Sequence, residues 1–252
     1  MERVDRPTVA TFFAPAPLAE GTAVTLGEDA AHHIRVRRLN VGDRLGLVDG
    51  AGGVAEGTLI RVAKGHAVVD VARLERRERP AAVHVLVPVA DRDRMLWLAE
   101  KCVELGATSW RPVLWRRSRS VSPRGEGTSF QSKVRARMAA ALTQCEGAWL
   151  PDTYPDATVE RAIAATPPGV RVVLEADGPP ILTLPLGTVV SIAVGPEGGL
   201  ERGEIDQLVG AGFAPASIGG HILRFETAAL AALAIVRASL ALSPPPAPEP
   251  HG

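Results

Sequence analysis

The sequence is poor in cysteine. Cys102 and Cys145 are the only two cysteines among its 252 residues, which is too few for a disulfide framework or for a cysteine-rich zinc site. Such sparse use of cysteine is typical of proteins in a reducing compartment. We therefore expect a cytoplasmic protein.

Long apolar runs are also missing. The first eight residues contain no apolar core of the length that a signal peptide needs. No uninterrupted apolar run approaches the roughly 18–20 residues of a membrane span. Because 46% of the residues are apolar, a normal share for a globular protein, we expect a soluble chain with a hydrophobic core and no membrane partner.

Signatures of several enzyme classes are absent as well. The chain has no G-x-x-x-x-G-K-[ST], which excludes a P-loop NTPase, and no early G-x-G-x-x-G, which disfavours a standard dinucleotide fold. It contains neither H-E-x-x-H nor C-x-x-C to hold a metal ion, and no G-x-S-x-G to present a serine nucleophile. We therefore expect no metal site.

The net charge is zero, but the two parts of the chain differ in sign. Residues 1–145 hold 23 Lys and Arg against 16 Asp and Glu, whereas residues 146–252 hold 5 against 12. One basic cluster consists of Arg35, Arg37 and Arg38, and a second lies between residues 106 and 145. Such asymmetry favours a basic surface that binds phosphate groups, although a solvated arginine-rich surface would show the same pattern.

Two patterns divide the chain. Residues 8–75 show short alternating runs separated by turns that contain Gly or Asp, which predicts a small β-barrel with one short helix at 29–39. From residue 82, continuous apolar runs alternate with helical segments, which predicts an α/β domain with a mostly parallel sheet covered on both faces. We place the domains at residues 1–77 and 78–243, and a proline-rich disordered tail at 244–252.

Glycine-rich segments follow two of the expected strands. G-P-E-G-G at residues 195–199 follows the apolar run at 191–194, and Gly219 and Gly220 follow the run at 215–218. Because the carboxyl ends of parallel strands open at one edge of a sheet, these loops and the loop after residue 174 should enclose a nucleoside-sized ligand. Taken singly, each loop could be no more than a strand-to-helix turn.

In combination the two motifs are far more specific. G-P-E-G-G followed by I-G-G-H-I-L-R-F-E-T-A-A at residues 218–229 closely resembles the SPOUT-class methyltransferases, which carry a C-terminal trefoil knot. Within that class the chain resembles the bacterial 16S ribosomal RNA uridine N3-methyltransferase family. The resemblance extends over nearly the whole chain and includes residues 32–50 in the family's PUA-like barrel, 99–107 in its first knot-domain helix and 117–121 in its basic loop.

The resemblance implies a fold, a reaction and partners. The fold would be an N-terminal PUA-like β-barrel and a C-terminal α/β SPOUT domain with a deep trefoil knot, assembled as a homodimer. The reaction would be methylation, with S-adenosylmethionine as methyl donor, of N3 of a uridine in the decoding region of 16S ribosomal RNA in the small ribosomal subunit. The residues implied to bind the donor are Leu174, Glu175, Gly195, Pro196, Glu197, Gly198, Gly199, Ile218, Gly219, Ile222, Leu223 and Thr227.

The basic clusters supply the expected RNA contacts. The residues are Arg35, Arg37, Arg38, Arg116, Arg117, Arg119 and Gln144. Where the family usually has Glu-Gln and then an Arg before a Pro, this chain has Thr143 and Gln144 and no Arg before Pro151.

The chemistry of the implied reaction suggests roles for two residues. Uridine N3 is a poor nucleophile while it carries its proton, so the enzyme must position the base and stabilise negative charge on its oxygens. Arg224 has a permanent charge and a planar fork that can meet a carbonyl oxygen, and Glu226 could orient it. No residue stands out as a general base.

Three other functions stay open. A SPOUT methyltransferase for another base or for a ribose 2′-oxygen would keep the same motifs. A non-catalytic RNA-binding assembly factor would have no need of both pocket motifs. An enzyme for small molecules would have no need of the arginine clusters.

Overall fold

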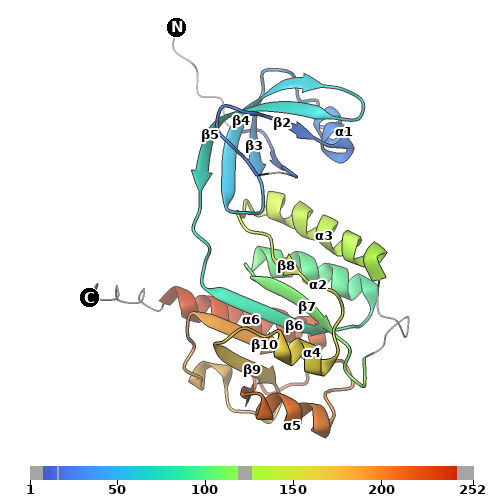
Figure 1. Ribbon diagram of the computed structural model, residues 1–252, viewed down its shortest axis with the longest axis vertical. Coiled ribbons are helices and arrows are strands. Elements are labelled where there is room, and N and C mark those ends of the chain that lie inside the picture. Colours follow the sequence, from blue (N-terminus) through green and yellow to red (C-terminus); the bar gives the residue numbers. More distant parts are fainter. Residues whose placement is uncertain (1–7, 16, 119–126, 243–252) are drawn as a thin grey trace, which may run out of the picture. The chain divides into compact units, whose positions relative to one another are not determined.

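The computed structural model describes residues 8–15, 17–118 and 127–242, and they form two compact units (Figure 1). The first unit ends at residue 80, close to the predicted boundary at 77, and also includes residues 134–150. This second segment joins the first unit because Gly52 N–H donates to Ala148 O and Leu150 N–H donates to Gly50 O. The tail predicted at residues 244–252 lies outside the described residues.

The first unit contains a five-stranded sheet, one short helix and the part of α3 (Gly127–Gln144) from residue 134 onward. Its elements are β1 (Thr11–Phe13), β2 (Ala23–Leu26), α1 (Glu28–Val36), β3 (Arg44–Val48), β4 (Gly53–Val62) and β5 (Ala67–Arg76). The strand order is β1-β3-β4-β5-β2, in which β1 pairs with β3 in parallel and the other pairings are antiparallel. Alternate residues of β4 are buried, as expected for a strand with one face on a core. The predicted all-β region with one short helix is confirmed.

The second unit contains a six-stranded sheet in which every pairing is parallel, as predicted. The strand order is β11-β9-β10-β6-β7-β8. Its elements are β6 (Ala82–Pro88), α2 (Arg92–Glu104), β7 (Ser109–Val113), α3 (Gly127–Gln144, shared with the first unit), β8 (Asp152–Thr153), α4 (Val159–Ala164), β9 (Val170–Leu174), η1 (Ile181–Thr183), β10 (Val189–Ala193), α5 (Arg202–Gly210), β11 (Phe213–Ala216) and α6 (Phe225–Leu242).

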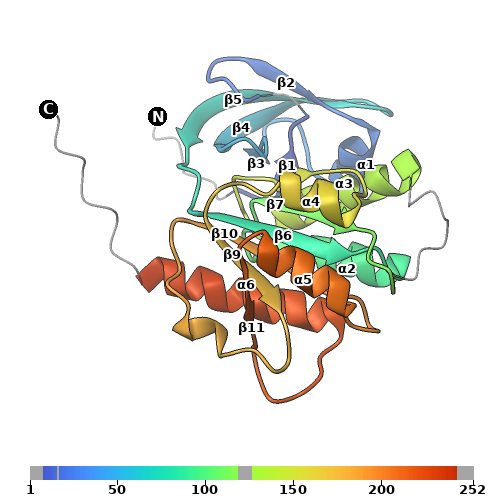
Figure 2. The same ribbon diagram turned by 60° about the horizontal axis from the view of Figure 1, so that its bottom comes forward.

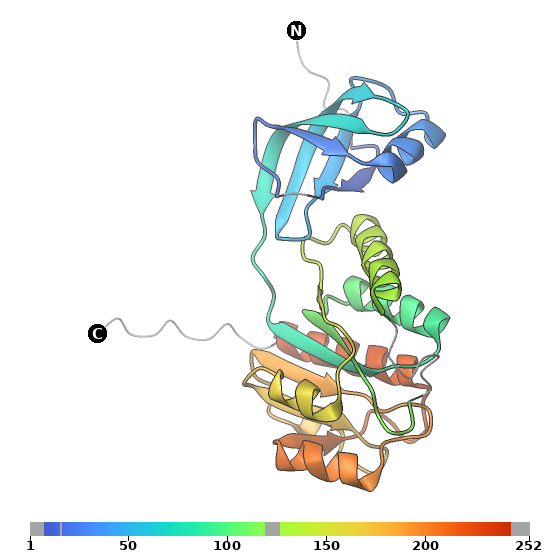
Figure 3. The ribbon, with the colours of Figure 1, turned by 45° about the vertical axis from the view of Figure 1, so that its right-hand side comes forward.

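Helices cover both faces of this sheet. On one face α6 packs against β6, β10 and α2. On the other face α4 packs on β7 and α5 on β11, around a cluster that includes Trp115, Val173 and Phe213. In Figure 3 the yellow α4 lies in front of the sheet and the red α6 lies behind it. Such two-sided cover explains why the strands read as continuous apolar runs.

Helix α2 begins and ends at residues that are typical of helix termini, and α6 is bonded to its end. The Asp91 carboxylate caps α2 by accepting a hydrogen bond from Arg94 N–H, and Gly106 follows the end of the helix with a φ of +69°. Arg237 of α6 donates hydrogen bonds to the carbonyl oxygens of Ala81 and Gly106, which holds the end of α2 and the start of β6 against α6.

Among the described helices, α6 alone is long and apolar enough to span a membrane by length and composition. About 33% of its residues are buried in the structure, and these include Ala229, Leu233 and Val236. One face of α6 therefore packs on the sheet.

The strand before the second glycine-rich segment differs from the prediction. β11 ends at Ala216, two residues before the predicted end at Ile218, because its register is set by parallel pairing with Arg171–Leu174 of β9. The connection to α6 is therefore a longer loop, residues 217–224, which Figure 2 shows at the lower edge of the unit. The length of this loop lets it form a wall of the site.

Candidate active site

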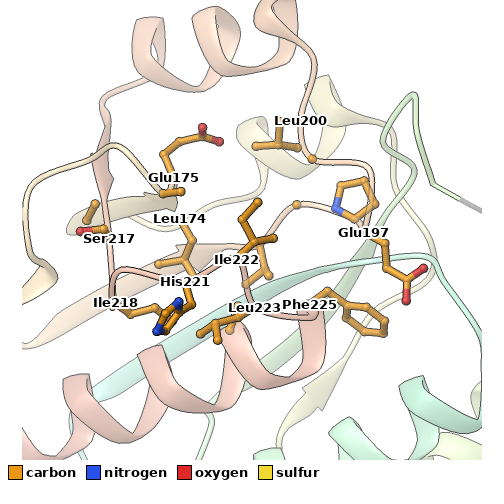
Figure 4. Close-up of a pocket in the computed structure, with 18 of the residues that line it drawn as sticks. Leu174, Glu175, Glu197, Leu200, Ser217, Ile218, His221, Ile222, Leu223 and Phe225 are labelled. Atoms are coloured by element: carbon orange, nitrogen blue, oxygen red, sulfur yellow. The ribbon is translucent and has the colours of Figure 1, made fainter.

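A pocket with a volume of about 340 Å³ opens beyond the carboxyl ends of β9, β10 and β11 (Figure 4). Three loops line it, at residues 174–176, 194–200 and 216–223, and the first turn of α6 adds Phe225 and Ala228. Of the residues expected to bind a methyl donor, all but Thr227 line the pocket, and Thr227 is exposed on α6. The pocket occupies the edge of the sheet where parallel α/β folds bind ligands.

Glycine lets these loops approach one another closely. A Cβ atom at Gly178 would lie 2.8 Å from main-chain atoms of Ala216, so only glycine fits between the loop after β9 and strand β11. Gly199 has a φ of +70°, and its N–H donates to Pro196 O at 2.8 Å to close a tight turn. Gly195, Gly198, Gly199 and Gly219 line the pocket and contribute only main-chain atoms to its wall.

The side chains of the lining are mostly apolar, with two carboxylates. Leu174, Ile222 and Leu223 lie together at the centre of Figure 4, and Glu175 and Glu197 lie on opposite sides of them. Burial, together with the nearby Asp177, raises the pKa of the Glu175 carboxyl. No Lys or Arg of the described chain lines this pocket.

The lining also contains polar side chains that the sequence analysis did not select. Ser217 and His221 belong to the loop between β11 and α6. Their position beside Gly219 and Gly220 is a signal that could have identified them, because the whole loop faces the ligand site rather than its glycines alone.

The structure does not bring Arg224 and Glu226 together. Arg224 is exposed and lies outside the pocket lining, whereas Glu226 is about nine-tenths buried in the first turn of α6. The recorded ion-pair partner of Glu226 is Arg94 of α2, with 3.9 Å between Glu226 Oε1 and Arg94 Nε. The orientation of Arg224 by Glu226 is absent from the described contacts and stays a prediction.

The first arginine cluster lies on α1 and just after it. Arg35 donates to the carbonyl oxygens of Ala31 and Lys64, which fixes its side chain along the surface of the first unit. Arg37 and Arg38 are exposed, and Arg38 adopts a φ of +57° where the helix ends. Gln144, at the end of α3, is exposed on the same unit.

The second cluster is tied to the pocket loop at residues 194–200. Arg117 Nη1 donates to Gly198 O at 2.8 Å, and Arg117 Nε lies 3.7 Å from Glu201 Oε1. Arg116 N–H donates to the Glu204 carboxylate at 2.8 Å. Arg119 lies outside the described residues. Arg116 and Arg117 therefore hold the loop at residues 194–200, and the start of α5 that follows it, in place.

Comparison with known proteins identifies the family. Residues 77–237 match the model of the RNA methyltransferase domain, and residues 26–72 match that of the RNA methyltransferase PUA domain. The chain belongs to the RNA methyltransferase family. Its resemblance to the SPOUT 16S ribosomal RNA methyltransferases is thereby confirmed, as are the PUA-like N-terminal domain and the mostly parallel α/β domain.

Individual relatives agree with this assignment. The chain is 32% identical to a ribosomal RNA small subunit methyltransferase E from Synechocystis sp., over 90% of this chain and 76% of the relative. It is 26% identical to the protein of that name from Bacillus subtilis, over 83% of this chain and 87% of the relative. A solved ribosomal RNA small subunit methyltransferase E from Neisseria gonorrhoeae, bound to S-adenosyl methionine, superposes with a TM-score of 0.83 and 25% identity over 91% of this chain and 97% of that chain.

Proposed function

We propose that this protein transfers a methyl group from S-adenosylmethionine to N3 of a uridine in the decoding region of 16S ribosomal RNA. Family membership supports RNA methylation, and the methyltransferase from Neisseria gonorrhoeae supports the identity of the donor. The observation that carries the proposal is the three-loop pocket, whose wall is mainly main chain and apolar side chains and contains no Lys or Arg from the described residues.

The residues of the pocket fit the donor. Leu174, Ile218 and Leu223 offer apolar surface for a purine ring, and the glycine loops offer main-chain groups that can read its polar edge. The carboxylates of Glu175 and Glu197 can accept hydrogen bonds from ribose hydroxyls or from an ammonium group, and they favour a positively charged ligand. S-adenosylmethionine, when bound, supplies an electrophilic methyl group on a positively charged sulfur.

The protein must also bind and orient the RNA. The arginines at positions 35, 37, 38, 116, 117 and 119 are proposed to contact phosphates, together with Gln144, and the partner is the small ribosomal subunit. Arg224 is exposed at the end of the loop that lines the pocket, so it is available to the RNA. Its predicted role beside the imide oxygens requires it to approach the pocket when RNA binds. A wild-type transfer rate for Arg224→Ala would remove that role.

A homodimer would cover apolar surface that the second unit leaves open. Trp97 of α2 is 47% exposed and Leu242 of α6 is 86% exposed, and two-thirds of α6 is not buried within one chain. Because α2 and α6 pack on each other, a second copy could cover both helices at once. The deep trefoil knot stays a prediction of the family resemblance.

The proposal is tested by methylation of small ribosomal subunits purified from a strain that lacks the gene. The wild-type protein and radiolabelled donor should yield N3-methyluridine on nucleoside analysis. Label in a ribose 2′-oxygen or in another base would point to a different methyltransferase of the same fold. RNA binding without any transfer would instead indicate a non-catalytic assembly factor.

A further inference from the structure

A second hollow lies beside the donor pocket. It has a volume of about 710 Å³ and is lined by Ala90, Asp91, Arg94, Arg117, Pro196, Glu197, Gly198 and Phe225. The last four of these residues line the donor pocket too. The two hollows are therefore neighbours that share one wall. Two ligands, one in each hollow, would both contact the residues of that wall.

The lining of the second hollow differs from that of the donor pocket. It contains two arginines, of which Arg117 already donates to Gly198 O, and Arg94 lies on the first turn of α2. The Asp91 carboxylate caps α2 through Arg94 N–H at 3.1 Å, so the main chain that carries Arg94 is fixed at the edge of the hollow. Phe225 and Pro196 supply a buried apolar surface opposite these charges.

Two acids hold the Arg94 guanidinium. Its Nη1 donates to the Glu197 carboxylate, and its Nε lies 3.9 Å from Glu226 Oε1. Glu226 is nine-tenths buried, and its Oε2 has no hydrogen-bond partner among the described residues. These contacts involve Nη1 and Nε, which leaves Nη2 for a ligand.

We infer that the second hollow binds the acceptor nucleobase and that Arg94 contacts an imide oxygen of that base, with Glu226 as the residue that positions Arg94. This inference rests on the proposed function, because it assumes an RNA base with an N–H flanked by two carbonyl groups. The apolar surface of Phe225 and Pro196 suits a flat base, and a guanidinium suits a carbonyl oxygen on which negative charge develops.

The charge of Arg94 matters because the acceptor must become an anion. N3 releases its proton to solvent, and the negative charge then spreads onto the two imide oxygens. The N3 lone pair forms the bond to the methyl carbon while the electron pair of the carbon–sulfur bond stays on sulfur, so that charge and atoms balance. A fixed cation beside one oxygen lowers the pKa of the bound imide, and it does so at the wall that the two hollows share.

The test compares full-length variants on three readouts. These are the affinity for S-adenosylmethionine by calorimetry, the single-turnover transfer rate to unmethylated small subunits, and the pH dependence of that rate. The variants are Arg94→Ala, Arg94→Lys and Glu226→Gln. Arg202→Ala is the control, because Arg202 forms an exposed i,i+4 pair with Asp206 on α5 and lines neither hollow.

Arg94→Ala should slow transfer about 100-fold, as expected when one hydrogen-bond donor to a developing oxyanion is removed. The affinity for S-adenosylmethionine should change less than about 3-fold, because Arg94 does not line the donor pocket. Its rate should keep rising at alkaline pH where the wild-type rate has levelled off, because an unassisted imide ionises at a higher pH. Arg94→Lys should recover part of the rate, Glu226→Gln should shift the pH profile in the same direction by less, and Arg202→Ala should match the wild type.

Two results would overturn the inference. One is a wild-type rate for Arg94→Ala. The other is a loss of affinity for S-adenosylmethionine in Arg94→Ala that is as large as its loss of rate. That result would mean that Arg94 only positions Glu197. If the wild type makes N3-methyluridine and Arg94→Ala transfers the methyl group at the wild-type rate, only the inference about Arg94 fails. If the wild type methylates a different kind of atom, the proposed function fails, and with it the assignment of Arg94 to an imide oxygen.

Discussion

The two neighbouring hollows are built in different ways. The donor pocket is made largely of loops whose glycines contribute main chain, and its few charged side chains are acids. The second hollow depends on side chains, with Arg94 fixed between Glu197 and Glu226. A pocket made of main chain is sensitive to the spacing of its loops, whereas one made of charged side chains is sensitive to single substitutions that leave the backbone in place. Changes in the first should affect donor affinity, and changes in the second should affect the rate of transfer.

After Arg94→Ala, the largest effect is expected from a substitution that moves the loops of the donor pocket apart. Gly178→Ala places a Cβ atom 2.8 Å from the main chain of Ala216, so the loop after β9 must move away from β11. An overpacking cost of about 1–3 kcal/mol should lower donor affinity about 10–100-fold. Calorimetry checks this against Gly203→Ala on α5, where nothing lies within 4 Å of the new Cβ atom. Equal affinities for the two variants would contradict a pocket defined by loop spacing.

A smaller effect is expected from Glu175, a partly buried carboxylate of the donor pocket. Glu175→Gln should lower donor affinity about 10-fold, because a hydrogen bond to a charged acceptor is worth about 1.5 kcal/mol or more. Burial and Asp177 raise the pKa of Glu175 above the ordinary 4.5, so the carboxylate is lost at a higher pH than usual as pH falls. Wild-type affinity should therefore weaken on acidification from a point above pH 4.5. Calorimetry at several pH values should show a flatter profile for Glu175→Gln, and identical profiles would exclude a role for this carboxyl.

The smallest effect on the site itself should come from the first unit. Arg37→Ala and Arg38→Ala remove exposed charges that line neither hollow. Each should reduce the slope of log affinity against log salt by about one if it contacts a phosphate. Donor affinity and the transfer rate at saturating RNA should stay at wild-type values. RNA titrations at several salt concentrations test this, and an unchanged slope in both variants would remove the first arginine cluster from the RNA surface.

The same contrast explains what could be predicted from the sequence. The donor pocket could be predicted because each of its loops is a contiguous motif that follows an apolar strand. Arg94 was missed because its partners lie far away along the chain, and Glu197 comes 103 positions after it. The grouping of residues 134–150 with the first unit also depends on contacts between distant parts of the chain, namely the hydrogen bonds that join Ala148 and Leu150 to Gly52 and Gly50. Patterns within a short stretch of sequence cannot indicate contacts between residues that are far apart along the chain.

The end of β11 shows a different limit. The prediction extended the strand to Ile218 because Pro215–Ile218 is apolar, but the strand ends at Ala216, where its pairing with β9 ends. Apolar residues beyond that point line the pocket instead of the sheet, and Ile222 is 92% exposed at its mouth. Exposed apolar side chains in a loop are a mark of a binding site that a hydropathy pattern cannot separate from a strand.

The most direct test of the central claim, that donor and acceptor occupy adjoining hollows with a common wall, is a crystal structure of this protein with S-adenosylmethionine. We expect the ligand among Leu174, Gly195 and Ile222, with its sulfur at the wall formed by Pro196, Glu197, Gly198 and Phe225, so that the methyl group points toward Arg94. A ligand whose sulfur faces away from that wall, or one that fills the hollow around Arg94, would contradict the account.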